Sequence, residues 1–194
     1  MINMKIYLLD INENMTYAWR TYFGNLNNIE IVNDSFLNFM IEHPDINGIV
    51  APANSFGLMT GGYDKAIIDY LGPGAQINVS TALKKAYNGY QPVGTCCAIP
   101  YSNYFILHTP TMRTPEPIID YRVIYDCMRS CLLKAKQLKL DAVVVPAFGA
   151  LTGRIPHDLV AKLMYLAYEH LNNPPIEIDW GYALAVANEI ILNN

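Results

Sequence analysis

The residues with the clearest chemical potential lie in one stretch, residues 49–67, which reads I-V-A-P-A-N-S-F-G-L-M-T-G-G-Y-D-K-A-I. A short apolar run ends at Ala51, polar residues and glycines follow, and a helical pattern resumes near Ala66. This order predicts a strand, a glycine-rich loop and a helix, which is where α/β proteins build ligand sites. Asn54 can bind sugar hydroxyls, and Asp64, ten positions later, falls in the first turn of the predicted helix.

The glycines of this stretch predict a phosphate-bearing ligand. Gly57, Gly61 and Gly62 let backbone N–H groups approach a ligand, and the following helix directs the positive end of its dipole at an anion. The loop matches neither G-x-x-x-x-G-K-[ST] nor G-x-G-x-x-G, which excludes a Walker motif and a Rossmann fingerprint. Because the net charge is −4 and no basic cluster occurs, the phosphates must be held mainly by backbone groups.

A second loop of the same kind follows the apolar run of residues 141–146 and reads A-F-G-A-L-T-G-R-I-P over residues 147–156. Gly149 and Gly153 permit a tight backbone, and a helix begins near Pro156. Two such loops can clamp a diphosphate. Phe148 is expected either to pack against a ribose or base, or to plug the core below the loop.

The two loops together resemble those of the macrodomain family, whose first loop runs through an Asn, a run of glycines and an Asp at this spacing. The resemblance covers about residues 29–170. It departs at Ala51, where the family has Asn, at Thr60-Gly61-Gly62, where the family has four glycines, and at Leu151, where many relatives have Gly. These departures indicate a divergent branch. The resemblance implies ADP-ribose, free or attached to a macromolecule, as the ligand and no cofactor.

The resemblance also implies which residues line the site. The expected ligand-binding residues are Asp34, Ser35, Ala53, Asn54, Ser55, Gly61, Gly62, Tyr63, Phe148, Gly149, Ala150, Leu151, Thr152, Gly153 and Arg154. Asp64 and Asn54 are the catalytic candidates. The Asp64 carboxylate would position water and stabilise positive charge on the distal ribose, which Asn54 would orient. The alternative role for Asp64 is a first-turn carboxylate stabilised by the helix dipole.

Two aspartates compete for the adenine amino group, which macrodomains bind through an Asp after the strand preceding the first loop. Asp10 and Asp34 each follow a predicted strand. Asp34-Ser35 stands where the family's Gly-Asp-Ile-Thr signature ends its strand, so we assign adenine to Asp34. Its alternative is a helix N-cap, and Asp10 is interpreted as a strand-end turn residue.

Three functions therefore remain open. The first is a hydrolase that removes mono-ADP-ribose from modified substrates. The second is a reader that binds ADP-ribose or a related nucleotide signal without turnover. The third is an ADP-ribose 1″-phosphate phosphatase, for which His157 or Lys65 could serve near the terminal phosphate. A lone histidine that ends an apolar run, His108, is interpreted as part of the core.

Length and composition favour one compact domain. The chain has 194 residues, 52% of them hydrophobic, which suffices for a sizeable core. We expect a single domain over residues 1–194 with an extra N-terminal strand and helix at about residues 1–28. Without a signal-peptide pattern or a long apolar run, we expect a cytoplasmic protein that does not bind membranes. The acidic net charge weighs against binding to duplex DNA. We also expect a monomer.

The four cysteines do not have zinc spacing. Cys96 and Cys97 are adjacent in a predicted strand, and Cys127 and Cys131 are four residues apart on a predicted helix. We therefore interpret all four as reduced, partly buried side chains and predict no metal site.

The elements that must position both loops follow from hydrophobic periodicity. Strands are predicted at residues 5–11, 29–32, 49–51, 93–99, 103–108 and 141–146, with the fourth and fifth forming a hairpin. Helices are predicted at 36–42, 75–87, 118–138 and 158–171, after Asn12 or Asn14, after the first loop and near the C-terminus. The pattern predicts a three-layer α/β/α fold with a mixed central sheet of about six strands.

Overall fold

A single mixed sheet organises the computed structural model, which describes residues 2–192. Its six strands lie in the order β2-β1-β6-β3-β5-β4; all neighbours are parallel except β4, which is antiparallel to β5. The bounds are β1 (Lys5–Leu9), β2 (Ile29–Val32), β3 (Gly48–Ala51), β4 (Cys97–Tyr101), β5 (Tyr104–His108) and β6 (Ala142–Val145). The predicted six-stranded mixed sheet is confirmed.

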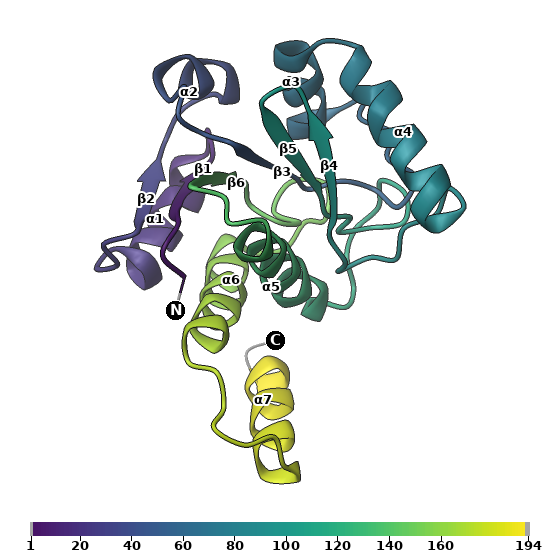
Figure 1. The fold of residues 1–194 in the computed structure, drawn as a ribbon. Coiled ribbons are helices and arrows are strands. Elements are labelled where there is room, and N and C mark those ends of the chain that lie inside the picture. The colour runs from purple at the N-terminus through teal and green to yellow at the C-terminus, as the bar shows by residue number, and fades with distance from the viewer. Residues whose placement is uncertain (1, 193–194) are drawn as a thin grey trace.

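Helices cover both faces of the sheet (Figure 1). On one face lie α1 (Glu13–Phe23), α5 (Arg122–Gln137) and α6 (His157–Asn172), and on the other lie α2 (Phe36–Glu42), α3 (Gly62–Leu71) and α4 (Gly74–Tyr87). A hydrophobic core lies on each face of the sheet, between the strands and the helices that cover that face. Each strand contributes to both cores because successive side chains point to opposite faces. In β1, Ile6 and Leu8 join the core under α5 and α6, whereas Tyr7 and Leu9 join the core under α2 and α3. The predicted three layers are confirmed.

The N-terminal strand and helix are built into the sheet. β1 lies between β2 and β6, with Ile6 opposite both Ile29 and Val143. Asn12 caps α1 and accepts a hydrogen bond from the Asn14 N–H. The carboxyl end of β1 therefore lies beside the carboxyl ends of β2 and β6.

The fourth strand differs from the prediction. A strand was expected at residues 93–99, but β4 runs from Cys97 to Tyr101. The preceding residues form a turn in which Gly94 has a φ of 76° and the Gln91 side chain binds the Thr95 carbonyl oxygen. Pro100 is tolerated inside β4 because β4 is the last strand at one edge of the sheet.

The long helix α5 begins later than predicted, at Arg122 instead of Ile118. Ile118 instead covers the second loop, where its N–H donates to the Gly153 carbonyl oxygen at 3.0 Å. Asp120 then accepts from the Arg122 N–H and holds the Arg122 guanidinium, which fixes the entry to the helix.

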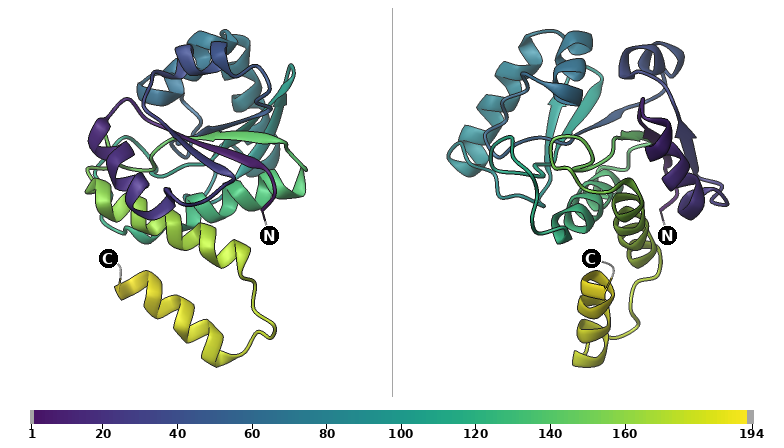
Figure 2. Two further views of the ribbon diagram at one scale, coloured as in Figure 1. Left: turned by 90° about the vertical axis from the view of Figure 1, so that its left-hand side faces the viewer. Right: turned by 180° about the vertical axis from the view of Figure 1, so that it is seen from behind.

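The final helix, α7 (Trp180–Leu192), packs on the outer side of α5 and α6, away from the sheet (Figure 2). His170 of α6 connects it to the body: His170 Nε2 lies 2.8 Å from Glu189 Oε2, and His170 Nδ1 lies 2.9 Å from the Tyr125 hydroxyl. Trp180 and Leu184 of α7 are exposed.

Candidate functional site

The two glycine-rich loops leave the sheet at the same edge. Loop 1 (residues 52–61) follows β3, loop 2 (residues 146–156) follows β6, and these strands are parallel neighbours. Asp10 and Asp34 follow β1 and β2, so they reach this edge as well. Ligand sites of open α/β sheets lie at such carboxyl ends.

Asn54 shapes loop 1 from within. Its Oδ1 accepts from the N–H groups of Phe56 and Leu58 at 3.1 and 3.3 Å, and its Nδ2 donates to the Leu58 carbonyl oxygen at 2.8 Å. The side-chain amide is thus bound to its own loop. Asn54 was expected to orient the distal ribose; in the structure its side chain holds the loop.

Ala53 and Ser55, which were expected to line the site, are buried and their N–H groups are occupied. The Ala53 N–H donates to the Thr109 carbonyl oxygen, and the Ser55 N–H donates to the Met112 carbonyl oxygen at 3.0 Å. They fasten the start of loop 1 to the segment after β5. These two residues therefore offer no free N–H at the start of the loop.

The end of loop 1 offers free backbone donors. Within residues 2–192, the N–H groups of Thr60 and Gly61 have no hydrogen-bond partner. The N–H groups of Gly62, Tyr63 and Asp64 belong to the first turn of α3, where no intrahelical acceptor is available. A Cβ added at Gly61 or Gly62 would meet no atom within 4 Å, so this side of the loop is open. The arrangement fits an anion at a helix N-terminus.

Loop 2 offers a second row of free donors. In the described part of the chain, the N–H groups from Gly149 to Gly153 have no partner, whereas those of Arg154 and Ile155 fold back onto loop carbonyl oxygens. A Cβ at Gly153 would lie 2.5 Å from the Gly149 carbonyl oxygen, so the tight turn requires glycine there. Successive unpartnered N–H groups form an anion-binding concavity.

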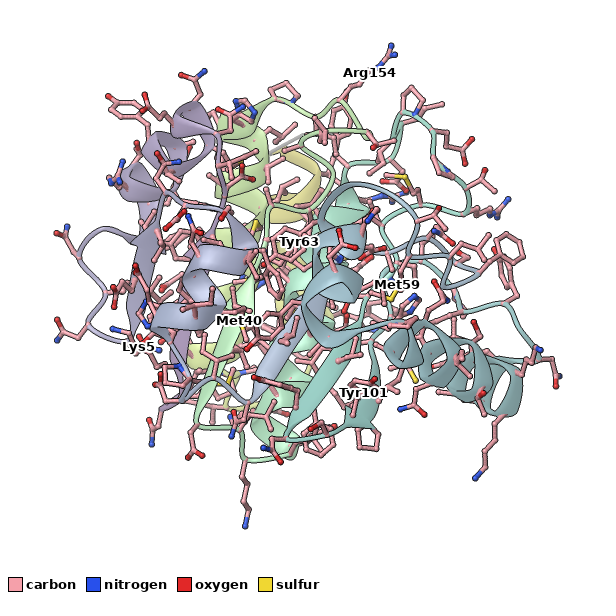
Figure 3. The ribbon with its side chains drawn as sticks, turned by 90° about the horizontal axis from the view of Figure 1, so that it is seen from above. Lys5, Met40, Met59, Tyr63, Tyr101 and Arg154 are labelled. Atoms are coloured by element: carbon pink, nitrogen blue, oxygen red, sulfur yellow. The ribbon has the colours of Figure 1, made fainter. Side chains whose placement is uncertain are left out.

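The side chains of loop 2 point in different directions. Phe148 is fully buried in the core, which favours the interpretation of a plug below the loop over that of a stacking face. Ala150 is half-buried, whereas Leu151, Thr152 and Arg154 are exposed. The Arg154 side chain projects outward at the margin of the molecule in Figure 3.

Asp64 is the most unusual ionisable group at this edge. It is 8% exposed, and its Oδ1 is buried without a hydrogen-bond partner among residues 2–192. Burial raises the pKa of Asp64 to about 7. A buried carboxylate without a partner is normally avoided, so this residue carries a cost that packing alone does not explain.

Tyr63 borders Asp64 in the same helical turn. Its ring contacts Phe36 edge to face, with the centroids 5.2 Å apart, and its hydroxyl is buried without a partner among the described residues. Burial, together with the charges of Asp10 and Asp64, raises the pKa of Tyr63. Figure 3 shows Tyr63 between α2, which carries Met40, and the loop that carries Met59.

The two candidates for adenine binding occupy neighbouring positions. Asp34 Oδ1 accepts from the Ser35 N–H at 2.6 Å and from Asn38 Nδ2 at 3.0 Å, while Ser35 is the N-cap of α2. Asp10 Oδ1 accepts from the Asn12 N–H, and burial raises the pKa of Asp10. The Asn33 side chain bonds the Asp10 carbonyl oxygen, which links the two strand ends.

Of the two residues considered for phosphatase chemistry, Lys65 is paired on its own helix. Lys65 Nζ lies 2.6 Å from both oxygens of Asp69. His157 is the first residue of α6 and is near enough to Asp10 to oppose the larger effect of burial on the pKa of that carboxyl. His157 therefore lies toward the edge that carries Asp10.

Sequence analysis did not identify the polar cluster beneath loop 1. His108 ends β5, is fully buried, and its Nδ1 donates to Gln91 Oε1 at 2.7 Å, because Gln91 Nε2 already faces three acceptors. His108 Nε2 has no partner within residues 2–192. Burial lowers the pKa of His108 to about 4. The pairing of Gln91 with His108 carries no local sequence signal, because the two residues are 17 positions apart in the chain.

Other features of the described residues lie outside this edge. A depression lined by residues such as Met4, Lys136 and Leu140 lies at the amino end of the sheet, opposite the edge that carries the free donors. Within residues 2–192, no group of three or more metal-ligating side chains occurs, and the four cysteines are free. No helix among these residues has the length and hydropathy of a membrane span.

Comparison with known proteins agrees with this fold. The family model described as Macro domain matches residues 50–164. The macrodomain of Mycobacterium tuberculosis DarG is similar in structure, with a TM-score of 0.56, 18% identity, and coverage of 66% of this chain and 84% of that chain. The Oceanobacillus iheyensis macrodomain with ADP has a TM-score of 0.53 and 24% identity, and the match covers 64% of this chain and 69% of that chain. The Trypanosoma brucei macrodomain in complex with ADP has a TM-score of 0.55 and 18% identity, and the match covers 87% of this chain and 58% of that chain. At these identities the likeness shows the fold.

Proposed function

The chain belongs to the macrodomain family, whose model spans more than half of it, and on this premise we propose that it binds ADP-ribose and removes mono-ADP-ribose from modified substrates. The diphosphate would lie between the free N–H groups at the end of loop 1 and those of loop 2. Adenine would lie toward Asp34 and Asp10, and the distal ribose toward Asp64.

The observation that carries the hydrolase proposal is the unpartnered, buried carboxylate of Asp64. A structural first-turn carboxylate would be solvated or bound to a backbone N–H, whereas Asp64 Oδ1 is neither. With a pKa of about 7, Asp64 is half ionised near neutral pH, which suits a general base. The free N–H groups beside it would hold the substrate without neutralising this charge.

The proposed reaction is water attack at the anomeric carbon of the distal ribose. Asp64 accepts a proton from water as the water oxygen bonds to that carbon, and the bond to the substrate's side-chain atom breaks. The leaving group keeps the bonding electron pair; a nitrogen leaving group takes a proton from solvent, a carboxylate leaves as the anion, and Asp64 then returns its proton to solvent. The Asp64 carboxylate also stabilises the positive charge that develops on the sugar ring.

A reader that binds without turnover is the second candidate. The Asn54 amide is fully engaged within loop 1, so it is not free to orient a ribose for reaction unless the loop rearranges. This observation favours binding over catalysis. The phosphatase has less support, because the Lys65 ammonium is paired with Asp69 on the same helix.

The test separates binding from turnover. ADP-ribose affinity is measured by calorimetry, and release of ADP-ribose is measured from Asp/Glu-linked and Arg-linked protein substrates and from ADP-ribose 1″-phosphate. Asp64→Asn should retain ADP-ribose affinity within a few-fold while turnover falls about 10²-fold or more, the scale of a lost general base. Asn54→Ala should lower both, because it releases the loop.

Wild-type turnover should rise with pH through about 7 as Asp64 ionises. If the wild type binds ADP-ribose but releases none from any of these substrates, the protein is a reader. If Asp64→Asn loses affinity and turnover in parallel, Asp64 holds the ligand and the catalytic assignment is wrong.

A further inference from the structure

The Gln76 side chain, on α4, forms two hydrogen bonds with the main chain of loop 1. Its Oε1 accepts from the Met59 N–H at 2.8 Å, and its Nε2 donates to the Gly57 carbonyl oxygen at 2.7 Å. Nε2 also donates to Ser80 Oγ at 3.1 Å, one turn further along α4, which fixes the side chain to its own helix. Gln76 is half-buried. A single side-chain amide thus binds loop 1 on both sides of Leu58.

The Asn54 side chain binds the alternate residues of the same segment, Phe56 and Leu58. Between them, the two side chains bind the N–H groups of residues 56, 58 and 59 and the carbonyl oxygens of residues 57 and 58. The Gly57 N–H is bound by the Asn54 carbonyl oxygen. Directly after Met59, the N–H groups of Thr60 and Gly61 have no partner in the described chain. The bound part of the loop therefore ends where the free donors begin.

The backbone of this segment requires such support. Gly57 has a φ of 68°, and its carbonyl oxygen would otherwise be free to turn. Two glycines follow at positions 61 and 62, and glycine loses the most conformational freedom on ordering. A loop that must be ordered on binding subtracts that entropy from the affinity, whereas a loop held beforehand does not.

From this geometry we propose that Gln76 is a positioning residue, which holds loop 1 in the shape that presents the N–H groups of residues 60–64 to a diphosphate. The inference rests on the proposed ADP-ribose site. Gln76 acts through the main chain of Gly57 and Met59 and needs no contact with the ligand for this role. Its contribution should therefore appear in the binding of the diphosphate and not in the binding of adenosine.

The test variants are chosen by hydrogen bonding. Gln76→Met keeps the length and volume of the side chain and removes both bonds to loop 1. Gln76→Glu keeps an acceptor for the Met59 N–H and loses the donor to the Gly57 carbonyl oxygen. Asn78→Ala is the matched control, because Asn78 lies on the same helix and its Nδ2 donates to the Pro100 carbonyl oxygen of β4, away from loop 1.

Two measurements are made on each variant: the affinities for ADP-ribose and adenosine by calorimetry, and hydrogen exchange of residues 56–61 in the ligand-free protein. Gln76→Met should weaken ADP-ribose binding about tenfold, since two modest hydrogen bonds are lost, and leave adenosine binding within about twofold. Exchange of the loop should become faster. Gln76→Glu should fall between Gln76→Met and the wild type, and Asn78→Ala should match the wild type.

The inference is overturned if Gln76→Met binds ADP-ribose as the wild type does, or if ADP-ribose and adenosine weaken equally. Should Gln76→Met not fold, Gln76→Glu decides by the same criteria. If the wild type does not bind ADP-ribose, the proposed function fails, and hydrogen exchange still decides the role of Gln76. Unchanged exchange of residues 56–61 in either Gln76 variant then overturns it.

Discussion

Replacing Asp64 by asparagine should stabilise the protein at neutral pH while it removes activity. An aspartate with a pKa of 3.8 in the unfolded chain and about 7 in the folded protein binds its proton more tightly when folded. The stability that this group contributes is therefore present below pH 3.8 and is lost as pH rises toward 7. At about 1.4 kcal/mol per pH unit, the loss amounts to about 4 kcal/mol.

Asparagine has nearly the same shape and no charge, so Asp64→Asn should escape this loss. The measurement is the free energy of unfolding by urea at pH 4, 5, 6, 7 and 8 for the wild type and the variant. Their difference cancels the other titrating groups. The unfolding free energy of the variant minus that of the wild type should increase by about 4 kcal/mol between pH 4 and pH 8.

Asp69→Asn is the control, because Asp69 lies on the same helix but is exposed and paired with Lys65. Loss of such a surface pair should change the unfolding free energy by about 1 kcal/mol or less. A difference between the wild type and Asp64→Asn that stays constant within about 0.5 kcal/mol from pH 4 to pH 8 would refute the reasoning, since each pH unit of pKa displacement must appear as about 1.4 kcal/mol.

Three further predictions concern the same edge of the sheet. His108→Gln should remove an acid sensitivity: with a pKa of about 4 in the folded protein against 6.5 unfolded, the His108 contribution to stability falls by about 3 kcal/mol as pH drops from 6.5 to 4. The unfolding free energy of the variant minus that of the wild type, measured in urea at both pH values, should therefore rise by about 3 kcal/mol over this range, and an unchanged difference would contradict the prediction. Gly61→Ala should leave the melting temperature within about 2 °C and weaken ADP-ribose binding, because its Cβ meets no protein atom within 4 Å and would occupy the open space before α3; unchanged affinity by calorimetry would place the diphosphate elsewhere. Asp34→Asn should reduce the preference for ADP-ribose over its analogue with inosine in place of adenosine, measured as the ratio of the two affinities by calorimetry. If only Asp10→Asn reduces this preference, adenine binds at the end of β1 and the assignment to Asp34 is wrong.

Local patterns in the sequence were enough to predict several of the elements that build the site. Phe36–Glu42 was predicted with its observed bounds, because Ser35 and the apolar residues after it form a local helix-start pattern. The loops were found because glycine marks positions where backbone must turn or approach a ligand, as the φ of 74° at Gly149 illustrates. Asn54 has a local signal as well, since asparagine commonly bonds the N–H two residues later, as it does with Phe56.

The contacts that hold the loops depend on residues far away in sequence. Ile118 continues the periodicity of α5, yet it leaves the helix to cover loop 2, where its N–H reaches the Gly153 carbonyl oxygen. Gln76 looks like an ordinary polar position on an amphipathic helix until α4 is placed beside loop 1. The burial of Asp64 likewise arises from packing around α3. Single-sequence patterns describe neighbours along the chain, so these pairings could not be predicted.

The most direct test of the proposed site is calorimetric titration of ADP-ribose into the wild-type protein at about 50 mM and about 500 mM salt, across which screening of exposed charges strengthens greatly. Free backbone N–H groups of loops 1 and 2 hold the diphosphate in this account, and the exposed Arg154 side chain points away. We predict binding whose affinity changes by less than about threefold between the two conditions, because fixed dipoles close to the ligand are screened little. A steep loss of affinity at high salt, or no binding at either, would contradict the account.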